Sequence, residues 1–152
     1  MVAEPDRAEL LAAVIRALPD WHVPLVQFNG MVADRLHVTQ NDLQCLYVLA
    51  HLGPATASEL AKRVNLTTGS ASRMIDRLAA RGYVTRHPDP HDRRRVLVQV
   101  DPDALERIST YYTPLNDRLR DDLAEFGADE LTALLRFIRA AERSTDAEIR
   151  RM

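Results

Sequence analysis

The chain has 152 residues, of which 46% are hydrophobic and 28% charged, with a formal net charge of -2 at pH 7 and a single cysteine. This length suits one domain or a compact two-part subunit, and no apolar run approaches the roughly 20 residues of a membrane-spanning helix. One cysteine excludes an internal disulfide, and the acidic residues Glu4, Asp6 and Glu9 are not typical of a secretory signal. We therefore expect a cytoplasmic protein with no membrane partner.

Residues 1–37 are expected to form two helical segments. Pro19 should end or kink the first, and the second should run from about Pro24 to Leu36. Apolar residues repeat at helical spacing in both, at Leu10, Leu11, Val14, Ile15 and Leu18, and then at Leu25, Phe28, Val32 and Leu36.

Residues 38–101 begin with two capping boxes, in which a hydroxyl residue precedes a carboxylate by three positions. Thr39 and Asp42 open a helix that ends at Gly53, and Thr56 and Glu59 open a shorter one. The apolar faces are expected at Leu43, Leu46, Tyr47 and Ala50 in the first helix, and at Ala57, Leu60, Ala61 and Val64 in the second.

A third helix follows the turn at Asn65 and Leu66, with Thr67 as its N-cap and Gly82 beyond its end. Its apolar positions are Ala71, Met74, Ile75 and Leu78, and its opposite face carries the candidate DNA contacts Thr68, Ser70, Ser72, Arg73 and Arg77. Small residues at the start allow a helix to enter a major groove, where an arginine can donate two bonds to a guanine edge. The alternative is a polar face that is merely solvated.

After Gly82 the spacing of apolar residues changes from the helical repeat to one typical of β-strands. Tyr83–Arg86 and Val96–Val100 are β-rich runs, the second with three valines on one face, and Pro88, Asp89, Pro90 and Asp92 mark the turn between them. Arg93, Arg94 and Arg95 lie where the second strand begins, so that a cationic tip could reach a minor groove.

Charge is unevenly distributed along the chain. Residues 57–101 contain nine Lys and Arg and five Asp and Glu, a net charge of +4, so the remainder carries -6. A basic module on an acidic protein is typical of a protein that binds a polyanion.

Residues 102–152 are again helical. Asp101 and Pro102 start a helix whose apolar seam is Leu105, Ile108, Tyr112, Leu115 and Leu119, with a kink expected near Pro114. A final helix after Gly127 carries Leu131, Leu134, Leu135 and Ile138.

The order of residues from Ala57 to Val100 resembles the winged-helix core of the MarR (multiple antibiotic resistance regulator) transcription factors. The most specific part is DRLAARGYVTR followed by DPHDRRRVLV, which contains Asp89, Asp92, Arg93 and Arg94. The resemblance implies a mainly α fold with a small β-hairpin wing (α+β), in which a winged helix-turn-helix core joins a helical dimerisation region. It also implies that Arg94 enters the minor groove and that Asp89 and Asp92 position the wing. His91 stands where the family often has a basic residue, which makes the tip less cationic at neutral pH.

The terminal helices could pack as a monomeric bundle or form an interface. We favour a homodimer, because two winged helices would read half-sites about one DNA turn apart. The resemblance adds that the first and last helices dimerise.

The sequence thus predicts a dimeric regulator that binds double-stranded DNA at a pseudo-palindromic operator. The resemblance implies that it is a repressor and that a small aromatic effector could release it. Trp21, Tyr47, Tyr111 and Tyr112 could line an effector pocket, although aromatic residues at such spacing more often belong to the core. The alternatives are a winged-helix module for protein contacts and a nonspecific DNA-binding protein without a ligand response.

An enzyme is not expected, because the chain has no glycine-rich phosphate loop, nucleophile elbow or HExxH pattern, and we predict no catalytic residue and no cofactor. Cys45 lies in an apolar helix and is expected to be a small buried hydrophobe rather than a redox sensor. His87, Asp89, His91 and Asp92 crowd one loop, but a spacing of four brings ligands together only on a helix, so no metal site is expected.

Overall fold

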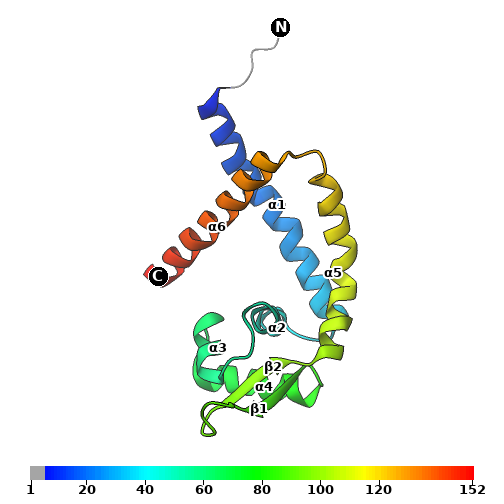
Figure 1. Cartoon of the computed structure of the whole chain (residues 1–152), viewed down its shortest axis with the longest axis vertical. Helices are drawn as coiled ribbons and strands as arrows, with labels where there is room; N and C mark the ends of the chain where they lie inside the picture. Colours follow the sequence, from blue (N-terminus) through cyan, green and yellow to red (C-terminus); the bar gives the residue numbers. More distant parts are fainter. Residues whose placement is uncertain (1–5) are drawn as a thin grey trace. The chain divides into compact units, whose positions relative to one another are not determined.

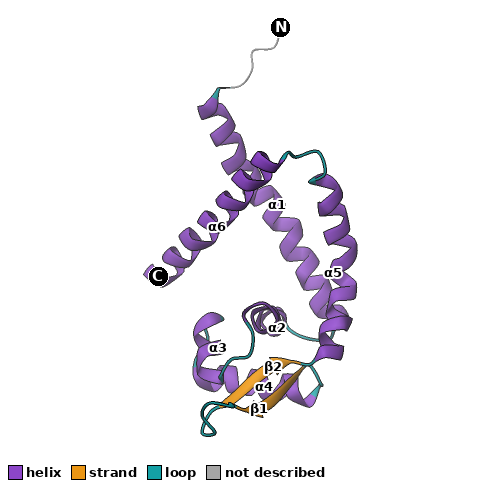
Figure 2. Cartoon of the chain, in the orientation of Figure 1, coloured by secondary structure: helices purple, strands orange, loops and turns teal. Residues whose placement is uncertain are grey.

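The computed structural model describes residues 6–152, so the expectation about Glu4 lies outside the described residues. They form six helices and one antiparallel pair of strands (Figures 1 and 2). In chain order these are α1 (Arg7–Arg35), α2 (Gln40–Leu52), α3 (Ala57–Arg63), α4 (Thr68–Ala80), β1 (Val84–Pro88), β2 (Val96–Val100), α5 (Pro102–Asp122) and α6 (Ala128–Arg151). The predicted fold class, mainly α with a β-hairpin, is confirmed. Among the helices in residues 6–152, none is both long and apolar enough to cross a membrane.

The chain divides into two compact units, one ending at Ser109 and the other running from Thr110 to Met152. The boundary falls within α5, so the first unit contains the winged helix-turn-helix together with α1, and the second contains the end of α5 and all of α6.

Helix α1 is continuous, so the prediction of two segments separated at Pro19 is wrong. A capping box between Asp6 and Glu9 starts the helix, and both Pro19 and Pro24 lie inside it. A proline inside a helix removes one hydrogen bond and crowds the preceding turn. Both prolines are exposed, so the carbonyl groups that lose their helical partner can bind water instead.

The winged domain comprises residues 38–101, and its core lies between α2, α3, α4 and the hairpin. Its buried side chains include Cys45, Leu46, Leu49, Leu60, Ala71, Met74, Ile75, Leu78, Val84 and Val98. In the hairpin Val84 pairs with Val100 and Pro88 with Val96. Of the three valines on one face of β2, Val98 is buried, whereas Val96, close to the wing loop, is 51% exposed.

Two aromatic residues that could have belonged to the core are exposed. Tyr47 is 62% and Trp21 57% exposed, and Tyr111 and Tyr112 are half-buried. The buried residues of α2 include Leu43 and Leu46, as predicted, together with Asp42, Cys45 and Leu49, whereas Tyr47 and Ala50 are exposed. The expectation that Tyr47 and Ala50 share the buried face is therefore wrong.

Local signals place α4 where the sequence predicts it. Asn65 adopts a positive φ of 52° in the turn before it, a conformation that asparagine tolerates better than most residues. At its end Gly82, with a φ of +71°, donates its N–H to Ala79 O, while Tyr83 N–H donates to Leu78 O. This is the Schellman arrangement, in which a left-handed residue satisfies the last carbonyl groups.

The predicted start of α5 and the Gly127 break before α6 are also observed. Asp101 Oδ1 accepts the N–H groups of Asp103 and Ala104, and Gly127 is the N-cap of α6. Helix α5 continues through Pro114. No residue of α6 is buried, and its apolar residues Leu135 and Ile138 are 48% and 50% exposed.

Candidate nucleic-acid interface

Helix α4 presents a polar ridge opposite its buried face. Thr68, Arg73 and Arg77 are exposed, and Ser70 and Ser72 are half-buried at the flanks. All five predicted DNA-contact residues of this helix thus lie outside the core. Asp76, which the prediction left out, is also exposed on the ridge, between Ser72 and Arg77 in the sequence.

The first turn of α4 is held by hydroxyl groups. Thr67 Oγ1 accepts the N–H of Ser70 at 3.2 Å, and its own hydroxyl donates to Ser70 Oγ at 2.9 Å. Arg73 Nη2 donates to the same Ser70 oxygen at 3.3 Å, so the guanidinium lies along the helix toward its N-terminus. An arginine has five N–H donors, so this bond leaves others for an acceptor on DNA.

Arg77 is already engaged by a buried carboxylate. Its Nη2 lies 2.5 Å from Asp42 Oδ1, and the Asp42 side chain is only 2% exposed, against 47% for Arg77. Burial opposes ionisation of Asp42, but hydrogen bonds from Arg77 and Thr39 outweigh it and hold the pKa of the carboxyl below its ordinary value. The ion pair between Arg77 and Asp42 therefore holds α4 against α2.

Further long-range contacts fix the second half of α4 and the chain that follows it. Asp76 pairs with Arg86 of β1 at 2.5 Å, and Arg81 donates to the carbonyl oxygen of His37. Tyr83 donates its hydroxyl to Leu36 O at 2.7 Å, and the Arg107 guanidinium lies 5.4 Å from the centre of the Tyr83 ring. Sequence reasoning missed these contacts, because no periodicity links residues ten to 47 positions apart.

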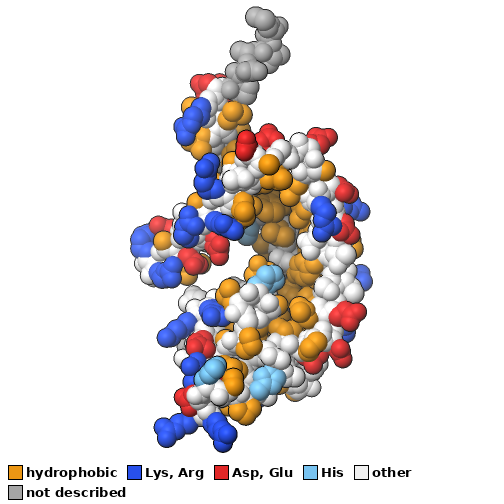
Figure 3. All heavy atoms as spheres, in the orientation of Figure 1, with side chains coloured by type: hydrophobic (Ala, Val, Ile, Leu, Met, Phe, Trp, Pro, Cys, Tyr) orange, Lys and Arg blue, Asp and Glu red, His pale blue; other side chains and the backbone are white. Residues whose placement is uncertain are grey.

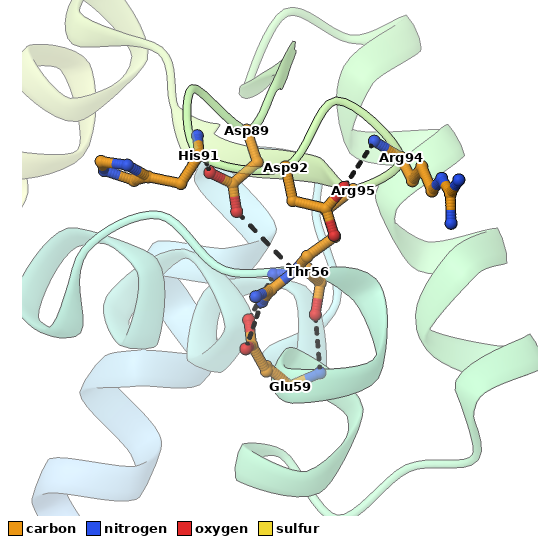
Figure 4. Close-up of polar contacts among 7 residues, drawn as sticks. All are labelled: Thr56, Glu59, Asp89, His91, Asp92, Arg94 and Arg95. Atoms are coloured by element: carbon orange, nitrogen blue, oxygen red, sulfur yellow. Dashed lines mark hydrogen bonds and ion pairs between the residues drawn. The ribbon is translucent and has the colours of Figure 1, made fainter.

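The wing loop is closed by main-chain bonds and two aspartates (Figure 4). Asp89 N–H donates to Arg95 O at 2.9 Å across the mouth of the loop. Asp89 Oδ1 accepts the N–H of His91, and Asp92 Oδ1 accepts the N–H of Arg94, each two residues further on. Such turns are typical of aspartate, and both aspartates lie where they hold the loop in shape.

The three wing arginines differ in their surroundings. Arg93 and Arg94 are exposed and make no ion pair within residues 6–152, and Figure 4 shows the Arg94 side chain pointing away from the other labelled residues. Arg95 instead turns toward α3, where its Nη2 lies 2.7 Å from Glu59 Oε1. Its Nε lies 3.7 Å from Asp89 Oδ2. Figure 3 shows Lys and Arg side chains gathered at the end of the domain that this loop forms.

Cys45 and the histidines and aspartates of the wing are the other residues whose side chains could take part in a reactive or metal site. Cys45 is fully buried, as expected, and burial, with the charge of Asp42, raises the pKa of its thiol to about 12. In residues 6–152, no cluster of three or more His, Cys, Asp or Glu side chains has the arrangement of a metal site.

Residues 38–96 match the model of the MarR family. The HTH-type transcriptional regulator YcgE of Bacillus subtilis, whose name describes it as uncharacterized, is 31% identical over 152 residues, covering 100% of this chain and 99% of that protein. The chain belongs to the MarR family. The multiple antibiotic resistance protein MarR of Salmonella typhimurium is also 31% identical, over 100 residues that cover 65% of this chain and 69% of that protein.

Solved structures agree on the fold. A MarR family protein from Bacillus stearothermophilus has a TM-score of 0.68 and 19% identity, over 93% of this chain and 99% of that one. MarR from Escherichia coli in its apo form has a TM-score of 0.56 and 21% identity, over 91% and 98% of the two chains. The fold and the relatives together identify the chain as a MarR-family transcriptional regulator with a winged helix-turn-helix, and YcgE, which the chain covers almost in full, is named as a transcriptional regulator.

Proposed function

We propose that this MarR-family regulator is a homodimeric repressor that binds a pseudo-palindromic operator in double-stranded DNA. The observation that carries the proposal is the exposed arginine set, Arg73 on α4 and Arg93 and Arg94 on the wing, within a segment of net charge +4. The rest of the chain carries -6, so this segment is the favourable surface for a polyanion.

The recognition helix supplies the sequence readout. Thr68, Ser70 and Ser72 are short enough to let α4 approach base edges, and Arg73 can donate to a guanine. Arg77 is half exposed, so nitrogens not used by Asp42 can reach a backbone phosphate. Arg93 and Arg94 would enter the neighbouring minor groove, where a narrow groove attracts arginine.

The proposed dimer is supported by apolar faces that a single chain leaves exposed. On α1, Leu10, Leu11, Val14 and Ile15 are 47–55% exposed, and on α6 Leu135 and Ile138 are exposed to a similar degree. Clusters of exposed apolar residues on one helix commonly mark an interface. Two copies would also place two recognition helices on one operator, and the second contact would be intramolecular.

Release by a small aromatic effector is part of the proposal. Trp21 and Tyr47 are exposed aromatic rings, and Tyr47 stacks on His51 with 4.0 Å between ring centroids. Exposed rings can stack on an aromatic ligand. Titration of the DNA complex with a panel of small aromatic acids and phenols, followed by fluorescence anisotropy, would test release directly.

The decisive experiment is selection of genomic DNA fragments by the purified protein, followed by sequencing, at two salt concentrations. We expect enrichment of an inverted repeat with half-sites about one turn apart. Weak binding that higher salt abolishes, with no enriched motif, would instead favour a nonspecific DNA-binding protein. No binding at either salt concentration would favour a winged helix used for protein contacts.

A further inference from the structure

Glu59 connects two elements with its two carboxylate oxygens. Oε2 accepts the backbone N–H of Thr56 at 2.8 Å, which completes the capping box of α3, and Oε1 accepts Arg95 Nη2 at 2.7 Å (Figure 4). Hydrogen bonds from Thr56, and then the charge and hydrogen bond of Arg95, hold the pKa of Glu59 below its ordinary value. A capping box needs one carboxylate oxygen, so the other is available to the wing.

The contact continues from Arg95 into the wing loop. Its Nε faces Asp89 Oδ2 at 3.7 Å, and the other oxygen of Asp89 accepts the N–H of His91 at 2.8 Å. Asp89 is 8% exposed, so a movement of the loop that displaced it would also disrupt its packing. A continuous chain of polar contacts thus runs from the N-terminus of α3 to the wing.

The other capping box of the domain is built in the same way. Asp42 Oδ2 accepts the backbone N–H of Thr39, and its Oδ1 holds Arg77 of the recognition helix. Each of these two helix N-termini therefore supplies a carboxylate that restrains an arginine of a DNA-binding element.

We infer that Arg95 is a positioning residue rather than a DNA contact: with Glu59 and Asp89 it sets the direction in which the wing leaves the domain, and thereby where Arg93 and Arg94 lie. This inference rests on the proposed DNA-binding function. It assigns different roles to three adjacent arginines, although the sequence alone treats them as one cationic cluster. Binding of a phosphate by the same Arg95 nitrogen would break its contact with Glu59.

Substitution of Glu59 distinguishes a positioning role of Arg95 from a direct DNA contact, because the two roles predict opposite changes in DNA affinity. Glu59→Gln removes a negative charge close to the binding surface, so simple electrostatics predicts tighter DNA binding. Loss of the contact with Arg95 predicts weaker binding instead. Glutamine also serves in capping boxes, so α3 keeps its start and the variant remains folded.

The experiment compares Arg95→Gln, Glu59→Gln and the double variant, with Arg94→Gln as the matched control. Because exposed ion pairs are individually weak, we expect Glu59→Gln and Arg95→Gln each to weaken binding to the selected inverted repeat by about two- to fivefold. The double variant should be no weaker than Arg95→Gln, because the two residues act through one contact. In the free protein, amide exchange at Asp89 should become faster in all three and stay unchanged in Arg94→Gln.

The salt dependence of DNA binding gives the result that would contradict the inference. Each lost phosphate contact lowers the slope of log affinity against log salt by roughly 0.9. If Arg95→Gln lowers the slope as Arg94→Gln does, and Glu59→Gln binds as well as or better than the unmodified protein, Arg95 is a DNA contact and the inference is wrong. If the unmodified protein binds no DNA, the proposed function fails, whereas amide exchange at Asp89 still tests whether Arg95 and Glu59 hold the wing.

Discussion

Six arginine side chains of α4, β1 and the wing divide into two groups by what their guanidinium groups contact. Arg77, Arg86 and Arg95 face the carboxylates of Asp42, Asp76 and Glu59 at 2.5–2.7 Å. Within residues 6–152, Arg73, Arg93 and Arg94 have no carboxylate partner, and Arg73 donates to the Ser70 hydroxyl. The second group remains available to an external anion.

The role proposed for Arg94 predicts the effect of its removal. Arg94→Ala should weaken operator binding by at least about tenfold, about 1.4 kcal/mol, because a charge in the narrow minor groove is lost. Anisotropy titrations with the selected operator measure the change, and sedimentation should show the same oligomeric state as for the unmodified protein. Equal affinity for the two proteins would exclude the wing from DNA binding.

The buried Asp42 predicts a pH-dependent stability. Its pKa is lowered in the folded protein, so its charge stabilises the fold at any pH above the ordinary carboxyl value, and this contribution is lost as the pH falls through the lowered value. Asp42→Asn should therefore lower the free energy of unfolding by about 1–2 kcal/mol at pH 7, which is less than for a fully buried pair because Arg77 is half exposed. Below about pH 4 the loss of stability should be smaller.

Urea unfolding across pH 3 to 8 would measure that difference. Arg86→Gln is a suitable control, because its ion pair with Asp76 is exposed on both sides and should contribute little at any pH. A stability difference for Asp42→Asn that is independent of pH would show that packing, not charge, is responsible.

At the scale of elements, α4 is determined by signals at its two ends. Thr67 caps its start and Gly82 its end, and its buried positions repeat at helical spacing between them. Sequence patterns predict this helix well because all these interactions join residues at most five positions apart. The course of α1 was predicted less well, since the effect of a proline depends on whether its surroundings solvate the freed carbonyl groups.

Substitution of alanine for two glycines of this region should have opposite effects on stability. Gly82→Ala should destabilise the fold by about 1 kcal/mol, because a φ of +71° strains any residue with a Cβ. Gly69→Ala should stabilise it by about 0.5–1 kcal/mol, since this helical position has nothing within 4 Å of an added Cβ. Thermal unfolding of both variants measures the contrast, and a gain in stability for Gly82→Ala would contradict the proposed role of the glycine in the cap.

At the scale of the whole molecule, the exposed apolar residues are the surfaces that the proposed dimer would bury. They lie on α1 in the first unit and on α6 in the second, and the apolar seam of α5 adds Leu115 and Leu119, which are half-buried. A symmetric dimer would bury such surfaces and fix the spacing of two recognition helices.

The proposed dimer predicts that a charge in the apolar seam of α5 disrupts it. Leu115→Asp, or Leu119→Asp, should yield monomers or insoluble protein, because a carboxylate would be buried in an apolar interface. Asn116→Asp, at an exposed position of the same helix, is the matched control and should remain dimeric. Sedimentation equilibrium distinguishes the states. Well-folded dimers from both leucine variants would place the interface elsewhere.

The sequence by itself determined the features that depend on near neighbours: the capping boxes at Thr39 and Thr56, the glycine that ends α4, the change of period at the hairpin and the concentration of positive charge in residues 57–101. Only the tertiary structure decided which arginines are held by carboxylates. Arg77 and Asp42 are 35 positions apart, and Arg95 and Glu59 are 36 apart. Contacts at such separations depend on how the elements pack, and no local spacing encodes that distance.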